Sequence, residues 1–396
     1  MSTLVADAPQ RLLEITRRAE ALYDDLELKT VRDWKAQKAG RKAIGFLPIY
    51  VPREVIHAAG ALPVGLMGGA DRVEIVRGDS YFQSYICHFP RSVIELAVGG
   101  KMDDLDGFLF PSICDVVRNL SGMFKMLLPT KYVHYVDLPQ NFDSNLGGRF
   151  YKSELKLMAR DFAKLTGTEV TDDRLRASIH IYNENRVALR RLLHARRDRP
   201  WEVPTIDYYL LLRAGYMLPV EEHTAMLNEY VELAAHAGRA RMDNIRVAVR
   251  GAFCEQPPLG LLRTLERAGC YVVDDDFVLG SRFIEVDLDT KGDPWDSLSE
   301  GFMHKSLPAA SKYDQRHTKH ADFVKRVRDF KADGVIFMAP SFCDPALLEQ
   351  PMLQKALEDA NIPFTAFKYS EDTGQFQVIR EQAGTFADAL KLWGNA

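Results

Sequence analysis

The sequence has few cysteines, little net charge and no long apolar run, and each of these shortages excludes a class of protein. Five cysteines among 396 residues, with no CxxC pair, are too few and too scattered for a disulfide framework. A net charge of −4 gives no electrostatic footprint for nucleic acid. No segment approaches the roughly 20 apolar residues that cross a bilayer, and the N-terminal residues lack the apolar core of a signal peptide. We therefore expect a cytoplasmic protein that binds neither nucleic acid nor membrane.

Nucleotide-binding motifs are missing as well. Neither GxGxxG nor GxxxxGK[ST] occurs, so the chain is not expected to bind a dinucleotide or to hydrolyse ATP itself. An apolar fraction of 46% and a charged fraction of 27% are nevertheless typical of a folded globular chain. The length suggests two or three domains.

Two parts of the chain repeat one order of elements. Ala43–Phe46 and Ile245–Gly251 are predicted strands, and each is followed by a proline-containing loop, a helix, Ala-Gly and a second strand. Short apolar strands joined by helices indicate parallel sheets covered on both faces. We predict an α/β fold with two similar doubly wound (Rossmann- or flavodoxin-like) domains. The expected division is an N-terminal helical lead-in at 1–42, a first α/β domain at 43–149, a helical insertion at 150–242 and a second α/β domain at 243–396, in which 281–323 is expected to be a long loop region.

One motif occurs once in each predicted domain: DGFLFPSICD (Asp106–Asp115) and DGVIFMAPSFCD (Asp333–Asp344). Ligands bind at the carboxyl ends of strands in open α/β sheets, so Cys114 and Cys343 are expected to meet in one cleft. A helix follows each cysteine, and a helix start should lower the pKa of a thiol. Cys87 also precedes a helical pattern. The three cysteines form a candidate site for a soft metal or an iron–sulfur cluster.

Other polar residues allow two readings each. A free cysteine is commonly a small buried hydrophobe, which suits Cys270 inside a predicted strand and leaves Cys254 in a strand-end loop ambiguous. The run Asp274–Asp276 could hold a hard cation but is more typical of a turn into solvent. Glu54 at a helix start could cap the helix or act as a general acid or base. HTKH (His317–His320) is more typical of a polar surface helix than of a zinc site.

The segments FLPIYVPREVIHAAGALPVGL, PSICD and PSFCD, with the region around Cys87, resemble the cluster-binding subunits of the 2-hydroxyacyl-CoA dehydratase and benzoyl-CoA reductase family from about residue 43 to 380. GAFCEQPP and CYVVDDDFVLGSRF are most similar to the smaller (C or gamma) subunit of ATP-dependent benzoyl-CoA reductases. The resemblance implies that Cys87, Cys114 and Cys343 ligate one [4Fe–4S] cluster and leave one iron open. Cys254 departs from this three-cysteine pattern and could line the site or tune the cluster without ligating it. Glu54 matches the helix-start glutamate of the family, which implies a proton donor or a positioning group.

The same resemblance implies an activity and its partners. The activity is low-potential electron transfer to benzoyl-CoA or another acyl-CoA thioester, giving a cyclic dienoyl-CoA during anaerobic degradation of aromatic compounds. The implied partners are a homologous larger cluster-binding subunit, ATP-hydrolysing activator subunits with a bridging iron–sulfur cluster, and ferredoxin as the upstream donor. Two alternatives stay open: a subunit of a 2-hydroxyacyl-CoA dehydratase that uses a ketyl radical, and a non-catalytic two-lobed binding protein with buried cysteines.

Overall fold

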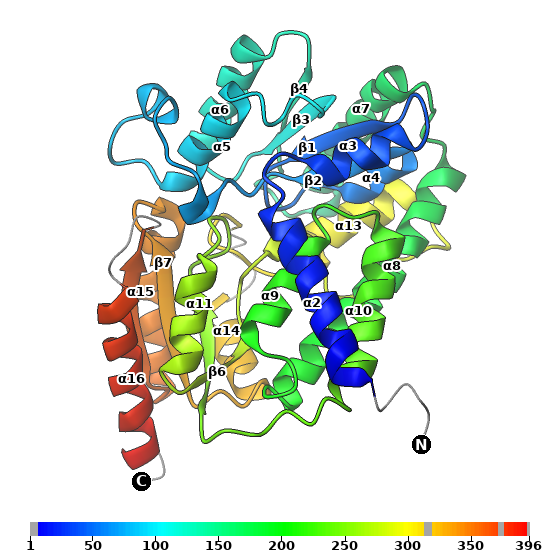
Figure 1. Ribbon diagram of the computed structural model, residues 1–396. Helices are drawn as coiled ribbons and strands as arrows, with labels where there is room; N and C mark the ends of the chain where they lie inside the picture. The colour runs from blue at the N-terminus through cyan, green and yellow to red at the C-terminus, as the bar shows by residue number, and fades with distance from the viewer. Residues whose placement is uncertain (1–6, 313–318, 371–375, 394–396) are drawn as a thin grey trace.

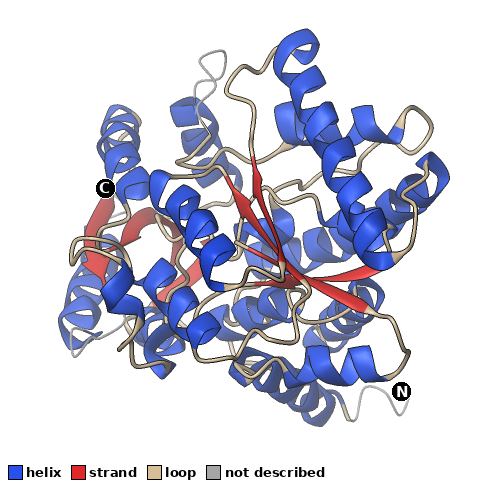
Figure 2. Ribbon diagram, turned by 90° about the horizontal axis from the view of Figure 1, so that it is seen from above, coloured by secondary structure: helices blue, strands red, loops and turns tan. Residues whose placement is uncertain are grey.

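The computed structural model describes residues 7–312, 319–370 and 376–393. Its strands form two four-stranded sheets, each surrounded by helices (Figures 1 and 2). All strand pairs within them are parallel, and the orders β2-β1-β3-β4 and β6-β5-β7-β8 are the same topology. The predicted α/β fold with two doubly wound units is confirmed. The sheets with their covering helices are named the first and the second lobe below.

The first lobe is built on the segment that was expected to form a strand, a helix and a strand. Its strands are β1 (Lys42–Phe46), β2 (Ala61–Gly65), β3 (Gly107–Pro111) and β4 (Tyr132–Val136). The accompanying helices are α4 (Arg53–Ala58), α5 (His88–Val98) and α6 (Asp115–Leu127), with short 3₁₀ turns at Ala70–Arg72 and Gly78–Tyr81. Every residue of β2 and β3 is buried, which is typical of parallel strands covered on both faces.

The second lobe repeats this arrangement. Its strands are β5 (Ile245–Arg250), β6 (Cys270–Asp274), β7 (Gly334–Pro340) and β8 (Phe364–Tyr369). Its helices are α11 (Leu259–Arg267), α12 (Leu279–Arg282), α14 (Lys319–Asp329), α15 (Asp344–Asp359) and α16 (Phe376–Trp393). Between α12 and α14 the chain forms α13 (Pro294–Lys305), which packs against the helical insertion instead of this sheet. β7 is buried along all seven residues and, like β3, stands in the middle of its sheet.

The helical insertion joins the lobes. It consists of a π-helical turn (Ser144–Gly148) and the helices α7 (Arg149–Thr166), α8 (Asp172–Asp198), α9 (Thr205–Ala214) and α10 (Val220–Ala234). The N-terminal α2 (Ala8–Asp24) packs against α9 and α10 (Figure 1). α8 holds a buried ion pair to each lobe: Arg186 pairs with Glu54 of α4, and Arg196 pairs with Asp275 at the end of β6.

One expectation about helices was refined and another was wrong. The lead-in consists of two helices, because the chain breaks after α2 at Leu28, whose φ is 51°, and begins α3 (Lys29–Ala36) under a cap from the Asp25 carboxylate. The region 281–323 is not a long loop, because it contains α13 and the start of α14. The Asp293 carboxylate caps α13 and Pro294 opens it, a helix-start signal that the sequence already carried.

Three further observations bear on the sequence-based expectations. None of the helices within the described ranges is long and apolar enough to cross a membrane. His317 of the HTKH segment lies outside the described residues, whereas His320 is in α14. The predicted domain boundaries stay predictions, although β1–β4 and β5–β8 fall within the two segments assigned to the α/β domains.

Candidate functional site

The topology of each sheet creates a crevice at its strand ends. The chain leaves β1 toward β2 on one side and then enters β3 on the other side of β1, and β5, β6 and β7 repeat this order. Loops diverge where the order reverses, and in open α/β sheets that is where ligands bind. Cys114 follows β3, Cys343 follows β7 and Cys254 follows β5. All three therefore lie beside a switch point of one of the two sheets.

The repeated Pro-Ser-x-Cys sequence has a common hydrogen-bonding role in both lobes. In both lobes the serine after the proline makes the last ladder bond to the neighbouring edge strand. The backbone N–H of Ser112 donates to the last carbonyl of β4 at 3.0 Å, and the N–H of Ser341 donates to the last carbonyl of β8 at 2.7 Å. Two residues later, Cys114 and Cys343 are the N-cap residues of α6 and α15. The motif thus turns each middle strand into a helix with a cysteine at the junction.

Cys87 and Cys254 join these two thiols. Cys87 is the N-cap residue of α5, as the sequence predicted for a helix start. Burial is the main cause that raises the pKa of Cys254 and of Cys87, and nearby thiolates add to it: Cys343, Cys114 and Cys87 for Cys254, and Cys343 and Cys114, after Glu255, for Cys87. The structure therefore brings four thiols from two lobes into one neighbourhood. Cys270 is separate and completely buried within β6, as expected of a core residue.

The net shift of the thiol pKa values is opposite to the expected one. Burial raises the pKa of Cys114, and burial raises that of Cys343 to about 12. Helix-start N–H groups do lower both values, those of Val117 and Val116 for Cys114 and that of Ala346 for Cys343, but burial outweighs them. Thiolates are therefore unfavourable here unless a cation accompanies them, and a bound metal removes the thiol proton by supplying that charge.

The donor set fits a soft-metal cluster better than a single ion. Within the part of the chain that the structure describes, no group of three or more His, Cys, Asp or Glu side chains is arranged to hold one metal ion. A cubane cluster makes a different demand, because each thiolate binds its own iron and the sulfurs lie farther apart. Thiolates are the ligands that such clusters prefer. Four neighbouring thiols, of which Cys343 is buried and the other three are half-buried, are consistent with that demand.

Two turns at the strand ends hold residues in the left-handed backbone region. Tyr50, after β1, has a φ of 64°, and Phe342, after β7, has a φ of 65°. A side chain makes this conformation costly, by about 1–3 kcal/mol, so the surrounding packing must hold it in place. Phe342 is 51% exposed and directly precedes Cys343. Strain of this kind gathers at functional sites and favours a site at this edge of the sheets.

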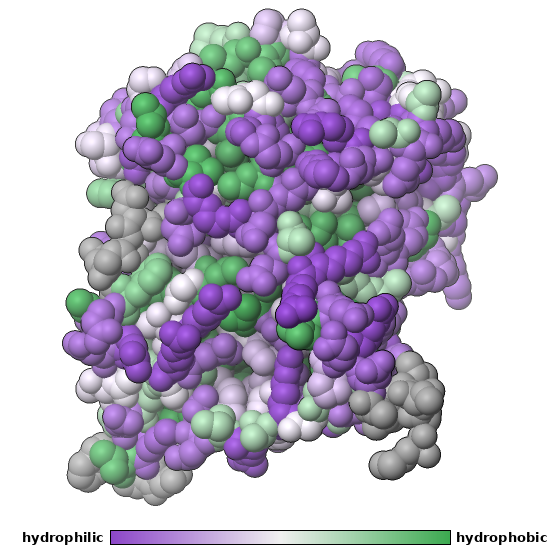
Figure 3. Space-filling view, in the orientation of Figure 1, coloured by the Kyte–Doolittle hydropathy of each residue, from purple (hydrophilic) through white to green (hydrophobic). Residues whose placement is uncertain are grey.

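A hollow of about 720 Å³ opens beside two of the thiols. Ile86 and Asp115, the chain neighbours of Cys87 and Cys114, both line it. Its other walls include Tyr81, Phe82, Tyr85, Met123 and Met126. Figure 3 shows apolar side chains gathered on the surface of the lobe that carries α5 and α6. The hollow is thus wide, partly aromatic and adjacent to the thiol site.

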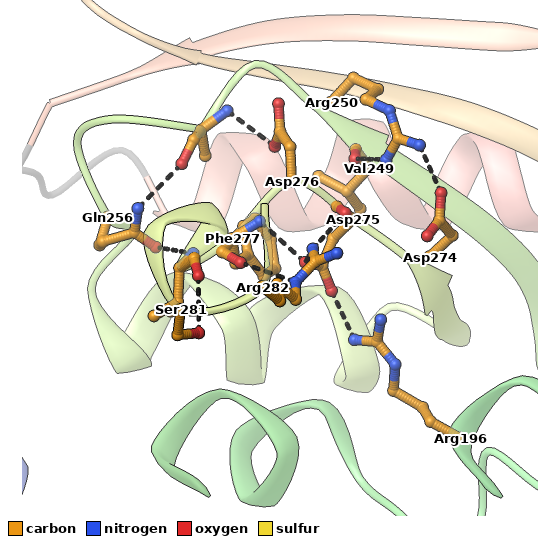
Figure 4. A network of polar contacts seen from close by, with 12 residues as sticks. Arg196, Val249, Arg250, Gln256, Asp274, Asp275, Asp276, Phe277, Ser281 and Arg282 are labelled. Carbon is orange, nitrogen blue, oxygen red and sulfur yellow. Dashed lines mark hydrogen bonds and ion pairs between the residues drawn. The ribbon is translucent and has the colours of Figure 1, made fainter. Parts of the chain in front are cut away.

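The three consecutive aspartates after Val273 do not turn into solvent, as the sequence had suggested. Asp274 and Asp275 are completely buried or nearly so, and arginines surround them (Figure 4). Arg326 donates to both oxygens of Asp274, at 2.9 and 2.8 Å, and Arg250 also pairs with this carboxylate. The arginines hold the pKa of Asp274 well below its usual range in spite of burial. Guanidinium groups therefore take the place of the hard cation that the sequence left open.

The next two carboxylates of the run have different partners. Asp275 accepts from Arg282 at 2.8 Å and pairs with Arg196 (Figure 4). Asp276 instead accepts from the backbone N–H groups of Gly251 and Ala252, at 2.8 and 3.1 Å, and burial raises its pKa to about 6. Asp276 thus fixes the loop that carries Cys254.

Glu54 lies in the structure as a buried member of an ion pair. Its carboxylate is paired with Arg186, and its backbone carbonyl accepts from the Ser178 hydroxyl at 2.9 Å. Both contacts are to α8, and Glu54 makes no side-chain cap at the start of α4. Its role as a proton donor or positioning group stays a prediction.

Comparison with known proteins relates this site to one family. The family model described as 2-hydroxyglutaryl-CoA dehydratase, D-component, matches residues 48–390. The C subunit of the benzoyl-CoA reductase of Thauera aromatica is 51% identical, over 96% of this chain and 99% of the relative. The (R)-phenyllactyl-CoA dehydratase beta subunit of Clostridium sporogenes is 27% identical, over 89% and 93%. The beta subunit of the (R)-2-hydroxyglutaryl-CoA dehydratase of Acidaminococcus fermentans is 29% identical, over 90% and 94%. The chain therefore belongs to the 2-hydroxyglutaryl-CoA dehydratase D-component family.

Proposed function

We propose that the chain is the [4Fe–4S]-binding subunit of an ATP-dependent benzoyl-CoA reductase. The observation that carries this proposal is the 51% identity to the C subunit of a benzoyl-CoA reductase over nearly the full length of both chains. The dehydratase beta subunits match over similar lengths but at only 27% and 29%. Such a difference favours the reductase reaction over the dehydratase reaction of the same family.

The thiol site supports the cofactor in this proposal. Cys87, Cys114 and Cys343 would each hold one iron of a [4Fe–4S] cluster, and Cys254 would line the same site. Once bound, the cluster would supply an electron at low potential and one iron without a cysteine ligand. The protein's part is to exclude water, and the burial that raises the pKa of all four thiols serves this purpose.

The hollow beside the thiols suits the proposed substrate. Small-molecule sites commonly enclose about 300–1,000 Å³, and this one encloses about 720 Å³. Its Tyr81, Phe82 and Tyr85 walls offer contacts to an aromatic acyl group, since aromatic rings pack favourably edge to face. An acyl-CoA bound there would bring its thioester toward Cys87 and Cys114, and transfer of two electrons and two protons to the ring would give a cyclic dienoyl-CoA.

The partners in this proposal follow from what the chain lacks. It has no phosphate-loop motif, so ATP would be hydrolysed by activator subunits with a bridging iron–sulfur cluster, supplied by ferredoxin. A homologous larger cluster-binding subunit would complete the enzyme, in the cytoplasm of an anaerobic cell. Glu54, held by Arg186, would act as a positioning group rather than as the proton donor.

Cysteine substitutions test the cluster. After anaerobic purification and reconstitution, the wild-type chain is expected to hold about four irons and to show visible thiolate-to-iron absorbance. Cys114→Ser and Cys343→Ser should abolish this absorbance. Cys270→Ser is the matched control, because this thiol is buried, as that of Cys343 is, but lies within β6, and it should leave the spectrum unchanged. Loss in the control, or retention in both site variants, contradicts the assigned ligands.

Substrate assays separate the alternatives. The family's dehydratase relatives favour, as a second candidate, a subunit that acts on a 2-hydroxyacyl-CoA. The chain co-expressed with its partner subunits should reduce benzoyl-CoA and leave 2-hydroxyacyl-CoA thioesters unchanged. The opposite preference would establish the dehydratase. A chain that takes up no iron under any reconstitution condition would be the non-catalytic two-lobed binding protein.

A further inference from the structure

The start of α5 is capped from the other lobe. The Cys87 side chain, at the N-cap position, makes no cap hydrogen bond of its own. The Glu255 carboxylate instead accepts from the backbone N–H of Phe89 at 3.0 Å, across 166 positions of sequence. The backbone N–H of His88 also donates to this carboxylate. A carboxylate on free helix-start N–H groups is a charge-assisted cap that also suits the helix dipole.

Glu255 reaches α5 from a firmly held loop. Its side chain is buried, at 3% exposure, and its backbone carbonyl accepts from the hydroxyl of Tyr369, the last residue of β8, at 2.7 Å. The amide of the neighbouring Gln256 donates to the carbonyls of Ala252 and Cys254 at 3.1 and 3.3 Å. The oxygen of this Gln256 side-chain amide accepts from the Val278 N–H at 2.8 Å. These contacts fix the carboxylate relative to β5, β6 and β8.

The cap therefore relates thiols of different lobes. Cys87 immediately precedes the two capped N–H groups, and Cys254 immediately precedes Glu255. The Glu255 carboxylate lies close enough to act electrostatically on both Cys87 and Cys343. We propose that Glu255 is a positioning residue that ties Cys87 of the first lobe to the thiols of the second lobe by capping α5 across the cleft. What the positioned thiols bind rests on the function proposed above.

The chain provides a matched control for this role. Glu266 of α11 accepts from the backbone N–H of Thr205, the first residue of α9, at 2.6 Å. Burial raises the pKa of this carboxyl as it does that of Glu255. Both glutamates thus cap a helix from another element, but α9 carries no thiol. A purely structural cap at either position should cost stability without affecting the cysteine site.

Hydrogen exchange on the metal-free protein tests the cap itself. Glu255→Ala should make the amides of His88 and Phe89 exchange on the order of tenfold faster, because a hydrogen bond to a charged group is lost. Glu255→Gln should retain most of the protection, since its amide oxygen can still accept. Glu266→Ala should affect only the start of α9. Unchanged exchange at His88 and Phe89 in Glu255→Ala overturns the proposal.

Iron content and spectroscopy test the consequence for the thiols. After anaerobic reconstitution, Glu255→Ala should hold less than half of the wild-type iron, or show an altered electron paramagnetic resonance spectrum of the reduced protein. Glu255→Gln and Glu266→Ala should match the wild type in both. A wild-type spectrum and iron content in Glu255→Ala would refute a positioning role, as would an equal loss in Glu266→Ala. If the wild-type chain itself takes up no iron, the proposed function fails, while the exchange comparison still decides whether Glu255 caps α5.

Discussion

Removing either partner of the buried pair between α8 and β6 should have very unequal effects. Arg196 and Asp275 are both completely or almost completely buried. Asp275 has a second cation, Arg282, and also accepts from the backbone N–H of Phe277. Arg196 is bonded to Asp275 through one nitrogen, while its Nε and second terminal nitrogen have no hydrogen-bond partner among the described residues. Its guanidinium lies 3.5 Å from the ring centre of Tyr208.

The magnitudes follow from what each substitution leaves behind. Asp275→Ala leaves a buried guanidinium without a counter-charge, and breaking a buried pair in this way costs about 3–5 kcal/mol. Arg196→Met leaves Asp275 with Arg282 and removes two unsatisfied donors, each of which costs about 1–3 kcal/mol. Methionine also fills a similar apolar volume over Tyr208. We therefore expect Arg196→Met to cost no more than about 1–2 kcal/mol.

Thermal unfolding gives the test, as a ranking of apparent midpoints, since a two-lobed chain need not unfold in one step. At roughly 2–4 °C per kcal/mol, Asp275→Ala should lower the midpoint by about 10 °C and Arg196→Met by a few degrees. Arg197→Met is the control on the same helix, because its partner Asp198 is 58% exposed and such surface pairs contribute about 0–1 kcal/mol. In the Arg196→Met/Asp275→Ala double variant, the midpoint should fall by less than the sum of the two single decreases, because the two residues are in contact. If Arg196→Met lowers the midpoint as much as Asp275→Ala, the reasoning from uncompensated charge is wrong.

Two further perturbations should report on other parts of the molecule. Burial, with a smaller contribution from Arg53, lowers the pKa of His223 from 6.5 to about 4. As the pH falls, the unfolded chain therefore binds a proton at His223 before the folded chain does. The contribution of this group to the free energy of unfolding should be complete above pH 6.5 and fall by about 3 kcal/mol toward pH 4. His223→Gln, compared with the wild type by unfolding at pH 7 and pH 5, should lose this pH dependence, and an unchanged dependence would show that another group causes it. A Cβ on Gly280 of α12 would lie 1.8 Å from the Pro48 carbonyl oxygen of the first lobe, so Gly280→Ala should lower the unfolding midpoint by several degrees. Gly384→Ala is the control, because nothing lies within 4 Å of its Cβ, and it should leave the midpoint unchanged or raise it.

Local signals made most of the fold predictable. Apolar runs followed by a proline-containing loop and a helical period located β1 and β5 to within about a residue. The repeat of Pro-Ser-x-Cys was informative because one arrangement, a last ladder bond donated by serine with a cysteine two residues later at a helix start, recurs in both lobes. α13 was missed although its Asp-Pro start was visible, because polar and glycine residues obscured the spacing of Trp295, Leu298 and Phe302.

Properties that depend on distant partners could not be read in the same way. Asp274 is buried because Arg326 reaches it from 52 positions away, and Asp275 because Arg196 does so from 79 positions away. A short stretch of sequence contains only the three adjacent carboxylates, and it therefore predicts that their side chains are exposed to solvent. The prediction of the thiol pKa values failed for a related reason. The lowering of the pKa by helix-start N–H groups is local and was predicted, whereas the larger increase caused by desolvation depends on how completely both lobes enclose the site. Glu255 was overlooked because nothing near it in sequence indicates which helix it caps.

The long helix α8 works as a spacer between the lobes. Arg186 is bonded to the first lobe and Arg196 to the second, ten positions further along one unbroken helix, which corresponds to about 15 Å. Adding or removing one residue between Arg186 and Arg196 would rotate one guanidinium by about 100° around the helix axis, away from its carboxylate. The number of residues between the two arginines can therefore change readily only by whole helical turns. The relative placement of the two lobes, which carry Cys114 and Cys343, is therefore set in part by a helix that is distant from both cysteines in sequence.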